Sequence, residues 1–465
     1  MAATNFAVGT GGLVTPSVQK MTLASSYLDI RNNGWAQQYL PELYNAEVEK
    51  YGDRSIGGFL QMLGAEMPMA SDQVIWSEQG RLHIAYQATV ATGSGSLSAI
   101  KNIDDTSGSD VAHGLRIGNT VVCSVQNVVF KGYVKSVGTN PVIVPYNAAT
   151  PGDISGITDD SNQTIKLFVY GSEFGKGANP MDESIEPKFL SLSNSPIIIK
   201  DHFEINGSDA GQIGWIEVSG ESGQGGYLWY LKSQGDTTKR FEDYLEMVLV
   251  EAEKADSTSG VGVEGSEGLL QAIGNRGIVA SNQFDSGATL SEYDDLLKEL
   301  DKQGAIEENM LFLNRDANLV FDDLLAGLSA GAQGGTAYGV FNNSEDMALN
   351  LGFTGFRRGS YDFYKTDWKY LNNKSTRGLV GGLSGLLIPA GTTSVYDQQL
   401  GKNVKRPFLH VRYRASEADD RKMKTWITGS VGGASTIGDD KMEVHYLSER
   451  CLVVQAANNF VRFDS

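Results

Sequence analysis

The stretch GSEFGKGANP, residues 171–180, is the first place where residue types and spacing suggest chemistry. It follows the apolar run IKLFVY and carries Gly175 and Lys176, as a loop that binds nucleotide phosphates would. Such a loop needs four residues between its glycines, whereas only three separate Gly171 from Gly175. It also needs a hydroxyl residue after the lysine and then a helix, but Gly177 follows, and prolines stand at 180, 187 and 196. The stretch therefore favours a glycine hinge, with Lys176 free to pair with a neighbouring acid, over a nucleotide site.

Other residues with catalytic or metal-binding chemistry are scattered. The histidines form no metal-ligand pattern; they are His83, His113, His202, His410 and His445. The glycine-bounded serines near 222 and 384 do not match the nucleophile elbow G-x-S-x-G. Acidic pairs at 104–105, 159–160 and 439–440 lack the spacing of a calcium loop. We therefore predict no catalytic residue, no metal and no cofactor.

Composition narrows the class of protein. The 465 residues are 41% hydrophobic and 20% charged, which is typical of globular chains, and 55 glycines against 11 prolines favour strands and turns. A net charge of −18 argues against a protein that mainly neutralises phosphates. Cys123 and Cys451 each lie in an apolar run, which predicts two buried thiols. The start lacks the features of a signal peptide and no run of 18 apolar residues occurs, so we expect a soluble protein made without export.

The first half of the chain reads as an arm followed by strands. Residues 1–45 mix small polar residues with aromatic anchors and predict an arm that lies on another surface. The run VIWSEQGRLHIAYQATV, 74–90, alternates apolar and polar residues around Glu-Gln-Gly, which predicts a hairpin. Short strand-like runs between 114 and 170 predict a small antiparallel barrel or sandwich. Further strands are expected over 197–231.

The second half changes to helical periodicity. Apolar residues from Phe241 to Ala252 recur at helical spacing, which predicts a helix of about 18 residues capped by Asp236 or Thr237, with an acidic outer face. Thr289 and Glu292 form a capping-box pattern before a second helix. The run 309–313 predicts a strand that leads into a third helix. Strand-like runs follow to the end, and the last, 442–463, predicts the longest strand pair.

This order of elements resembles the major capsid protein of tailed double-stranded DNA bacteriophages, the Hong Kong 97-type fold, in particular those of crAss-like and marine phages. The stretches that carry the likeness are FLQMLGAEMPMASDQVIWSEQGRLH (59–83), LFVYGSEFGKGANP (167–180), NSPIIIKDHFEINGSDAGQIGW (194–215), TTKRFEDYLEMVLVEAEKA (237–255) and MEVHYLSERCLVVQAANNFV (442–461).

The resemblance implies an α+β fold with a division of the chain into six parts. These are an N-terminal arm (1–45), the start of a peripheral domain with an extended β-hairpin loop (46–94), an inserted small β-barrel or sandwich (95–172), the rest of the peripheral domain with a long spine helix at 236–255 (173–257), an axial domain (258–440) and C-terminal strands that return to the peripheral domain (441–465). The inserted unit is larger than the basic fold needs, so it would be an outward decoration or a clamp between capsomers.

The implied function is self-assembly into hexamers and pentamers of an icosahedral shell in the virion, formed in the host cytoplasm around double-stranded DNA that is bound without sequence specificity. Scaffolding, portal and decoration proteins would be partners, and no membrane would be involved. The inter-subunit contact candidates are Trp35, Tyr39, Trp76, Leu82 and Lys176. Two alternatives stay open: another assembly such as a tail part or encapsulin-like compartment, and a β-rich carbohydrate-active enzyme.

Overall fold

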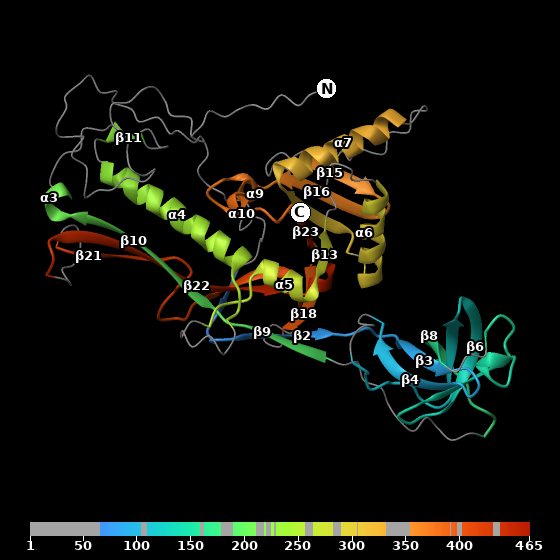
Figure 1. Ribbon diagram of the computed structural model, residues 1–465. Coiled ribbons are helices and arrows are strands. Elements are labelled where there is room, and N and C mark those ends of the chain that lie inside the picture. The colour runs from blue at the N-terminus through green and yellow to red at the C-terminus, as the bar shows by residue number, and fades with distance from the viewer. Residues whose placement is uncertain are drawn as a thin grey trace.

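In the computed structural model, described residues run from 66 to 465 with gaps (Figure 1). They are 66–103, 109–158, 162–177, 189–210, 218–219, 225–226, 229–255, 264–281, 290–304, 306–331, 354–390, 392–397, 402–430 and 438–465. The predicted arm, residues 1–45, lies outside them. The described part is a mixed α/β, strand-rich chain, as expected of the α+β class.

A closed barrel of six strands occupies the N-terminal third of the described chain. Its strands run in the spatial order β3-β4-β7-β6-β5-β8, and their bounds are β3 (Ala85–Ala91), β4 (Ser96–Asn102), β5 (Asn119–Val125), β6 (Val128–Ser136), β7 (Val142–Pro145) and β8 (Gln163–Ser172), with a short 3-10 helix η2 (Pro151–Asp153). Alternate residues such as Val121, Cys123 and Val125 point inward and are fully buried. Gly95 turns the chain at φ 71°, where a Cβ would lie 2.1 Å from the carbonyl oxygen of Ile143.

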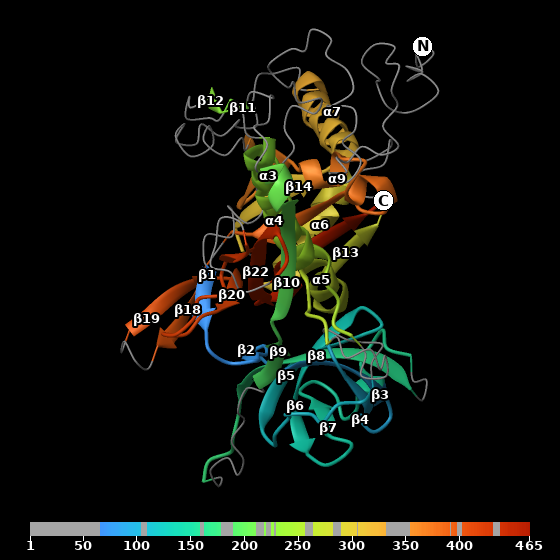
Figure 2. The same ribbon diagram turned by 90° about the vertical axis from the view of Figure 1, so that its left-hand side faces the viewer.

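The small β unit that the sequence predicts is therefore a barrel, and it begins earlier than expected. The expected start is residue 95, but β3, which begins at Ala85, already belongs to the barrel. Its apolar core is a cluster of its own, separate from the cores of the two large sheets. Figures 1 and 2 show the barrel away from those sheets.

A two-stranded antiparallel ribbon connects the barrel to the rest of the chain. It pairs β2 (Val74–Gln79) with β9 (Phe189–Asn194), the segments that precede and follow the barrel in sequence. The predicted hairpin over 74–90 is therefore wrong: β2 does not pair with β3, because β3 pairs with β4 and β8 inside the barrel. The alternation of apolar and polar residues predicted both strands correctly, but the partner of β2 lies more than a hundred residues away in the sequence.

The first large sheet carries the long helix. Its strands are β1 (Glu66–Met69), β20 (Leu409–Arg414), β22 (Lys441–Val454), β10 (Ile197–Asn206) and β21 (Lys424–Gly429). Helix α4 (Trp229–Glu251) packs on β10 and β22 through Phe241 and Leu245, which meet Phe203, Val444 and Tyr446. Each such fully buried side chain contributes about 1.5–3 kcal/mol.

Two predictions about α4 need correction. The helix begins at Trp229, so Asp236 and Thr237 lie inside it and do not cap it, and the run 229–231 is helical although the sequence predicts a strand there. Its expected acidic outer face is also interrupted, because Glu246 is only 3% exposed. The predicted apolar stripe of Phe241, Tyr244, Leu245, Val248 and Ala252 is confirmed at Phe241 and Leu245, which are buried, whereas Tyr244 is 39% exposed.

The second large sheet has six strands and two covering helices. In spatial order these are β13 (Ile278–Ser281), β23 (Val461–Asp464), β17 (Gly385–Pro389), β14 (Glu308–Leu313), β16 (Tyr361–Asp367) and β15 (Thr354–Arg358), with α6 (Leu290–Gln303) and α7 (Arg315–Gly331). Tyr293, Leu296 and Leu300 form the buried stripe of α6, as the sequence predicts. The predicted strand–helix unit at 309–328 is also confirmed by β14 and α7.

The C-terminal residues contribute to both sheets. The longest described strand, β22, belongs to the first sheet, and β23 belongs to the second, so the expected strand pair within 442–463 is wrong. The turn between them holds Ala456 at φ 53° and the short helix η3 (Ala457–Asn459). The closing strands therefore join the two sheets.

The remaining described elements are short. They are α3 (Gly207–Ala210), β11 (Val218–Ser219) with β12 (Gly225–Gly226), α5 (Leu269–Arg276), α9 (Lys369–Asn372), α10 (Arg377–Val380) and the pair β18 (Thr392–Asp397) and β19 (Lys402–Pro407). Among the described helices, none is long and apolar enough to cross a membrane.

Candidate functional site

The glycine-rich stretch singled out in the sequence begins in the barrel wall. Gly171 lies within β8, paired with Thr120 of β5, so the first glycine of the suspected phosphate loop is a strand residue. Gly177 adopts φ 76°, which fits the predicted hinge there, and Lys176 is exposed. Within the described ranges, no three His, Cys, Asp or Glu side chains are grouped as metal ligands.

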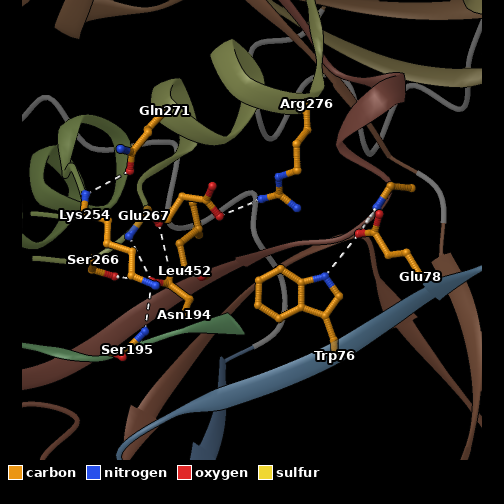
Figure 3. Close-up of polar contacts among 11 residues, drawn as sticks. Trp76, Glu78, Asn194, Ser195, Lys254, Ser266, Glu267, Gln271, Arg276 and Leu452 are labelled. Atoms are coloured by element: carbon orange, nitrogen blue, oxygen red, sulfur yellow. Dashed lines mark hydrogen bonds and ion pairs between the residues drawn. The ribbon is translucent and has the colours of Figure 1, made fainter. Parts of the chain in front are cut away.

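A buried, densely hydrogen-bonded polar site lies where the ribbon meets the first large sheet. Asn194, the last residue of β9, is 1% exposed and makes five hydrogen bonds (Figure 3). Its Nδ2 donates to the carbonyl oxygens of Leu452 at 2.7 Å and Glu267 at 3.0 Å. Its Oδ1 accepts from the backbone N of Ser195 and of Glu267, both at 2.9 Å, and from Oγ of Ser266 at 3.1 Å. One amide side chain thus ties β9 to β22 and to the segment before α5.

The other ribbon strand is held by Trp76 and Glu78. Trp76 is 8% exposed and its Nε1 donates to Oε1 of Glu78 at 3.1 Å. The same oxygen accepts from the backbone N of Ala456 at 3.0 Å. Ala456 has the left-handed backbone conformation, which is unfavourable for a residue with a Cβ. The bond from Glu78 therefore supports a strained turn and fixes β2 to it.

The guanidinium of Arg276, on α5, completes the site. Nη2 of Arg276 lies 2.6 Å from Oε2 of Glu267, and its guanidinium carbon is 5.9 Å from the centre of the Trp76 ring. Both side chains of this ion pair are less than one-fifth exposed. Arg276 is the last residue of α5, where a cation is favoured by the helix dipole. Figure 3 shows it between the Asn194 group and Trp76.

Helix α5 is itself fixed to the end of α4. The backbone N of Lys254 donates to Oε1 of Gln271 at 2.9 Å. Gly268 lies so close to Ala252 that a Cβ would be 2.6 Å from its carbonyl oxygen, so glycine is required for this approach. We call Trp76, Glu78, Asn194, Ser266, Glu267 and Arg276 the ribbon anchor. It sets the direction of the ribbon relative to α4, α5 and β22.

The opposite face of the ribbon is apolar at both ends. Since side chains alternate along a strand, Ile75 and Phe189 point away from Trp76, and they are 63% and 64% exposed. Leu82, just beyond β2, is 74% exposed. Ile75 and Phe189 stand at opposite ends of this face, with Ser77, Ser191 and Ser193 between them, so each is a separate exposed apolar group.

The barrel also exposes aromatic side chains, on its outer wall around the end of β8. Tyr146, Phe168, Tyr170 and Phe174 are each 44–50% exposed. The rings of Tyr133 and Tyr146 are 5.7 Å apart, and the hydroxyl of Tyr146 donates to Glu173 at 2.5 Å, which raises the pKa of Tyr146 to about 12. Residues 85–177 hold six basic and seven acidic side chains, so the barrel is nearly neutral in a strongly acidic chain.

Structures of phages and of an encapsulin resemble this chain. A structure of Microbacterium phage Oxtober96 matches with a TM-score of 0.40 at 10% identity, over 94% of this chain and 99% of that chain. The capsid structure of cyanophage P-SCSP1u matches with a TM-score of 0.33 at 8% identity, over 63% and 79%. The SrpI encapsulin complex from Synechococcus elongatus matches with a TM-score of 0.33 at 12% identity, over 60% and 77%.

Two of these structures come from phages and one is an encapsulin. No family model and no curated protein matches the chain.

The five predicted contact residues lie in different kinds of position. Trp35 and Tyr39 lie outside the described residues. Trp76 is buried in the ribbon anchor of its own chain, which leaves little of it for another copy, whereas Leu82 and Lys176 are exposed. As inter-subunit contacts, all five stay predictions.

Sequence reasoning missed most of the ribbon anchor. Asn194 stands at the end of a recognisable strand and before Ser195-Pro196, yet no local pattern reveals a partner 258 residues away at Leu452. Glu78 resembles part of a turn in the sequence. Arg276 offered one signal, a base in the last turn of a short apolar helix, but its contact with Trp76 depends on the tertiary fold.

Proposed function

We propose that this chain is the major capsid protein of a tailed double-stranded DNA phage, which assembles with copies of itself into the hexamers and pentamers of an icosahedral shell. One observation carries this proposal. A ribbon anchored in a buried polar site presents exposed Ile75 and Phe189 on its outer face and leads to a barrel away from the body (Figure 1).

The physical reason is that the exposed apolar side chains of the projecting ribbon do not stabilise a monomer. Exposed apolar side chains on a two-stranded ribbon are unfavourable in water unless another surface covers them. An isolated ribbon is also marginally stable, so the anchor keeps its direction fixed. A fixed, projecting ribbon with Ile75 and Phe189 exposed at its two ends is suited to lie across a neighbouring copy.

The parts of the capsid fold follow from this proposal. The ribbon of β2 and β9 is the extended loop within 46–94 and its return strand, and α4 is the spine helix of the peripheral domain. The second large sheet belongs to the axial domain within 258–440, while the N-terminal arm (1–45) reaches a neighbour. β22 returns to the peripheral domain, and β23 ends in the axial one. The barrel acts as a clamp between capsomers, with its aromatic outer wall as the contact.

An encapsulin-like compartment is a second candidate, because the same ribbon and sheets would serve any closed shell. The two differ in what they enclose. Purified particles that contain DNA after expression in the phage's host favour the capsid, and particles filled with a protein cargo favour the compartment. The role proposed here is structural in both cases.

Electron microscopy of the purified chain tests the proposal. We expect closed shells for the natural chain, and soluble subunits without shells for the double variant Ile75→Ser, Phe189→Ser. The matched control is Leu319→Ser, since Leu319 is 55% exposed on α7, away from the ribbon. Monodisperse monomers of the natural chain at high concentration would overturn the proposal.

A further inference from the structure

Three neighbouring strands of the barrel carry lysines and aromatic side chains but no acidic residue. They are β5, β6 and β8, which pair in the order β6-β5-β8. Their sequences hold Lys131, Lys135 and Lys166 and no aspartate or glutamate. The whole chain has 56 acidic residues against 38 lysines and arginines, so the surface of these strands is opposite in charge to the protein as a whole.

The strand register brings lysines and apolar side chains onto one outward face. Lys131 and Phe168 stand on either side of Val122 in the middle strand, β5. Two positions further along β5, Val129 and Lys166 stand on either side of the next outward residue. With the next tyrosine of β6 and of β8, these side chains form what we call the β6–β8 face: Val129, Lys131, Tyr133, Lys166, Phe168 and Tyr170.

The two lysines occupy diagonal corners of this face. Lys131 and Lys166 lie on different strands and in different rows, so Val129 and Phe168 fill the other two corners. Val129 is 66% exposed, Phe168 is 49% exposed, and both lysines are exposed. Neither lysine pairs with a carboxylate of the described residues. The single chain therefore leaves both the charges and the apolar side chains of the face uncovered.

Charge indicates which surface covers this face. A matching partner supplies carboxylates for two lysines and apolar atoms for the side chains between them. The barrel is nearly neutral, so almost the whole net charge of −18 lies in residues outside 85–177, which we call the body. The body of the same chain does not cover the face, since the face is exposed and Figure 2 shows the barrel away from the large sheets. In a shell, the acidic surface that comes close to it is the body of another copy.

We propose that the β6–β8 face of one copy docks on the acidic body of a second copy, where Lys131 and Lys166 pair with carboxylates. This contact rests on the proposed shell function and names the partner of the barrel. Exposed ion pairs add little affinity, but they select the surface and its orientation, while the covered apolar side chains supply the affinity. Because different patches of the two copies meet, the contact is head-to-tail, as in closed rings.

A nucleic acid is the other acidic partner to consider, because lysines interleaved with aromatic rings suit single strands. Affinity for nucleic acid grows with the number of phosphates that are neutralised, and β5, β6 and β8 together offer only three lysines. A nearly neutral barrel also has no positive field that attracts a polyanion from a distance. These observations favour a protein partner.

Charge reversal gives the first test. The double variant Lys131→Glu, Lys166→Glu puts two acids on the face. The matched control is Lys239→Glu, Lys374→Glu, which changes two exposed lysines of the body and alters the net charge by the same amount. We expect the first variant to raise the concentration needed for assembly about tenfold beyond the control, and Lys131→Arg, Lys166→Arg to assemble normally. An equal effect of the two glutamate variants, both folded by circular dichroism, would overturn the proposal.

Carbodiimide cross-linking identifies the partner surface directly, because it joins a lysine to a carboxylate in contact with it. Particles or oligomers are formed from equal parts of isotope-labelled and unlabelled chain, so a linked peptide with one labelled and one unlabelled half joins two copies. We expect such mixed peptides to link Lys131 or Lys166 to acids of the body. Links that occur only within one copy, or only between barrels, contradict the proposed contact.

The outcomes separate this contact from the shell function on which it rests. Shells without mixed links to the body leave the capsid role standing and refute the contact. Mixed links in small oligomers without shells support the contact and count against the capsid role. If the full chain binds a fluorescent single-stranded oligonucleotide and Lys131→Glu, Lys166→Glu abolishes this binding, the face belongs to a nucleic acid and the contact is refuted.

Discussion

At the residue scale, the ribbon depends on one side chain more than on any other within the described ranges. Asn194 supplies two N–H donors to carbonyl oxygens and one acceptor to three donors, all in a buried setting. No residue of the same size except asparagine offers both functions, since aspartate has no N–H group when it is ionised. The direction of the ribbon is thus fixed by hydrogen bonds that a single oxygen-for-nitrogen change would break.

We expect Asn194→Asp to lower the free energy of unfolding by about 3 kcal/mol, because each buried polar group left without a partner costs about 1–3 kcal/mol and two carbonyl oxygens lose theirs. Urea unfolding of the subunit measures this. Asn102→Asp is the matched control, since Asn102 is exposed on β4 and should change stability little. A loss for Asn194→Asp no greater than that of the control would show that the hydrogen bonds do not hold the ribbon.

A second prediction at the residue scale concerns the two cysteines and the pH dependence of stability. Burial raises the pKa of Cys123 and of Cys451 to about 12. Because the folded thiols resist ionisation, their contribution to stability is complete below about pH 9 and declines as the pH rises from there toward 12. We expect no reaction with a thiol reagent in the native protein near neutral pH and two reactive thiols in guanidinium chloride. A thiol that reacts at once in the native protein would contradict the burial of that residue.

At the element scale, local patterns predicted the elements and failed on their partners. The buried stripes of α4 and α6 and the strand β14 follow directly from apolar spacing. The hairpin at 74–90 is wrong because β2 and β3 alternate equally well with any partner, and the true partner of β2 follows the whole barrel. Local patterns do not predict the start of α4 correctly. Gly235 and Asp236 resemble a helix boundary in the sequence, but the helix begins earlier, at Trp229, and continues through them. The ribbon anchor is beyond local reasoning for the same reason, since its hydrogen bonds join distant segments.

The pairing of β2 with β9 predicts that the barrel can be removed. Gln79 stands opposite Phe189, so an Asn-Gly turn in place of residues 80–188 would close the ribbon as a tight hairpin. We expect the shortened chain to fold, with the melting transition of the body kept, because the barrel core is separate from the others. The deletion also removes the hydrogen bond that Nη2 of Arg81 donates to the carbonyl oxygen of Lys302 on α6, which is exposed and should cost the body little.

Thermal melting and limited proteolysis of the shortened chain measure this outcome. The control keeps the barrel and replaces Gly95 with alanine, which forces a Cβ to within 2.1 Å of a carbonyl oxygen and should destabilise the barrel alone. Insoluble or fully protease-sensitive shortened chain would show that the body needs the barrel to fold.

At the scale of the whole molecule, charge opposes assembly while apolar surface favours it. A net charge of −18 makes copies repel one another, whereas exposed apolar side chains such as Ile75 and Phe189 gain from burial. Acidic copies in a shell would also hold DNA loosely on the inner wall, which suits a genome that must be driven in. The same balance makes assembly sensitive to ionic strength.

We expect assembly to become faster as sodium chloride rises from about 0.01 M to about 0.5 M, because the Debye length falls from about 30 Å to below about 10 Å and the repulsion between copies is screened. Light scattering follows the rate, and electron microscopy of the end points distinguishes shells from aggregates. Close to the isoelectric point of about 4.8, the net charge is small and the salt dependence should nearly vanish. Assembly that slows as salt rises would mean that attraction between opposite charges, and not apolar contact, brings the copies together.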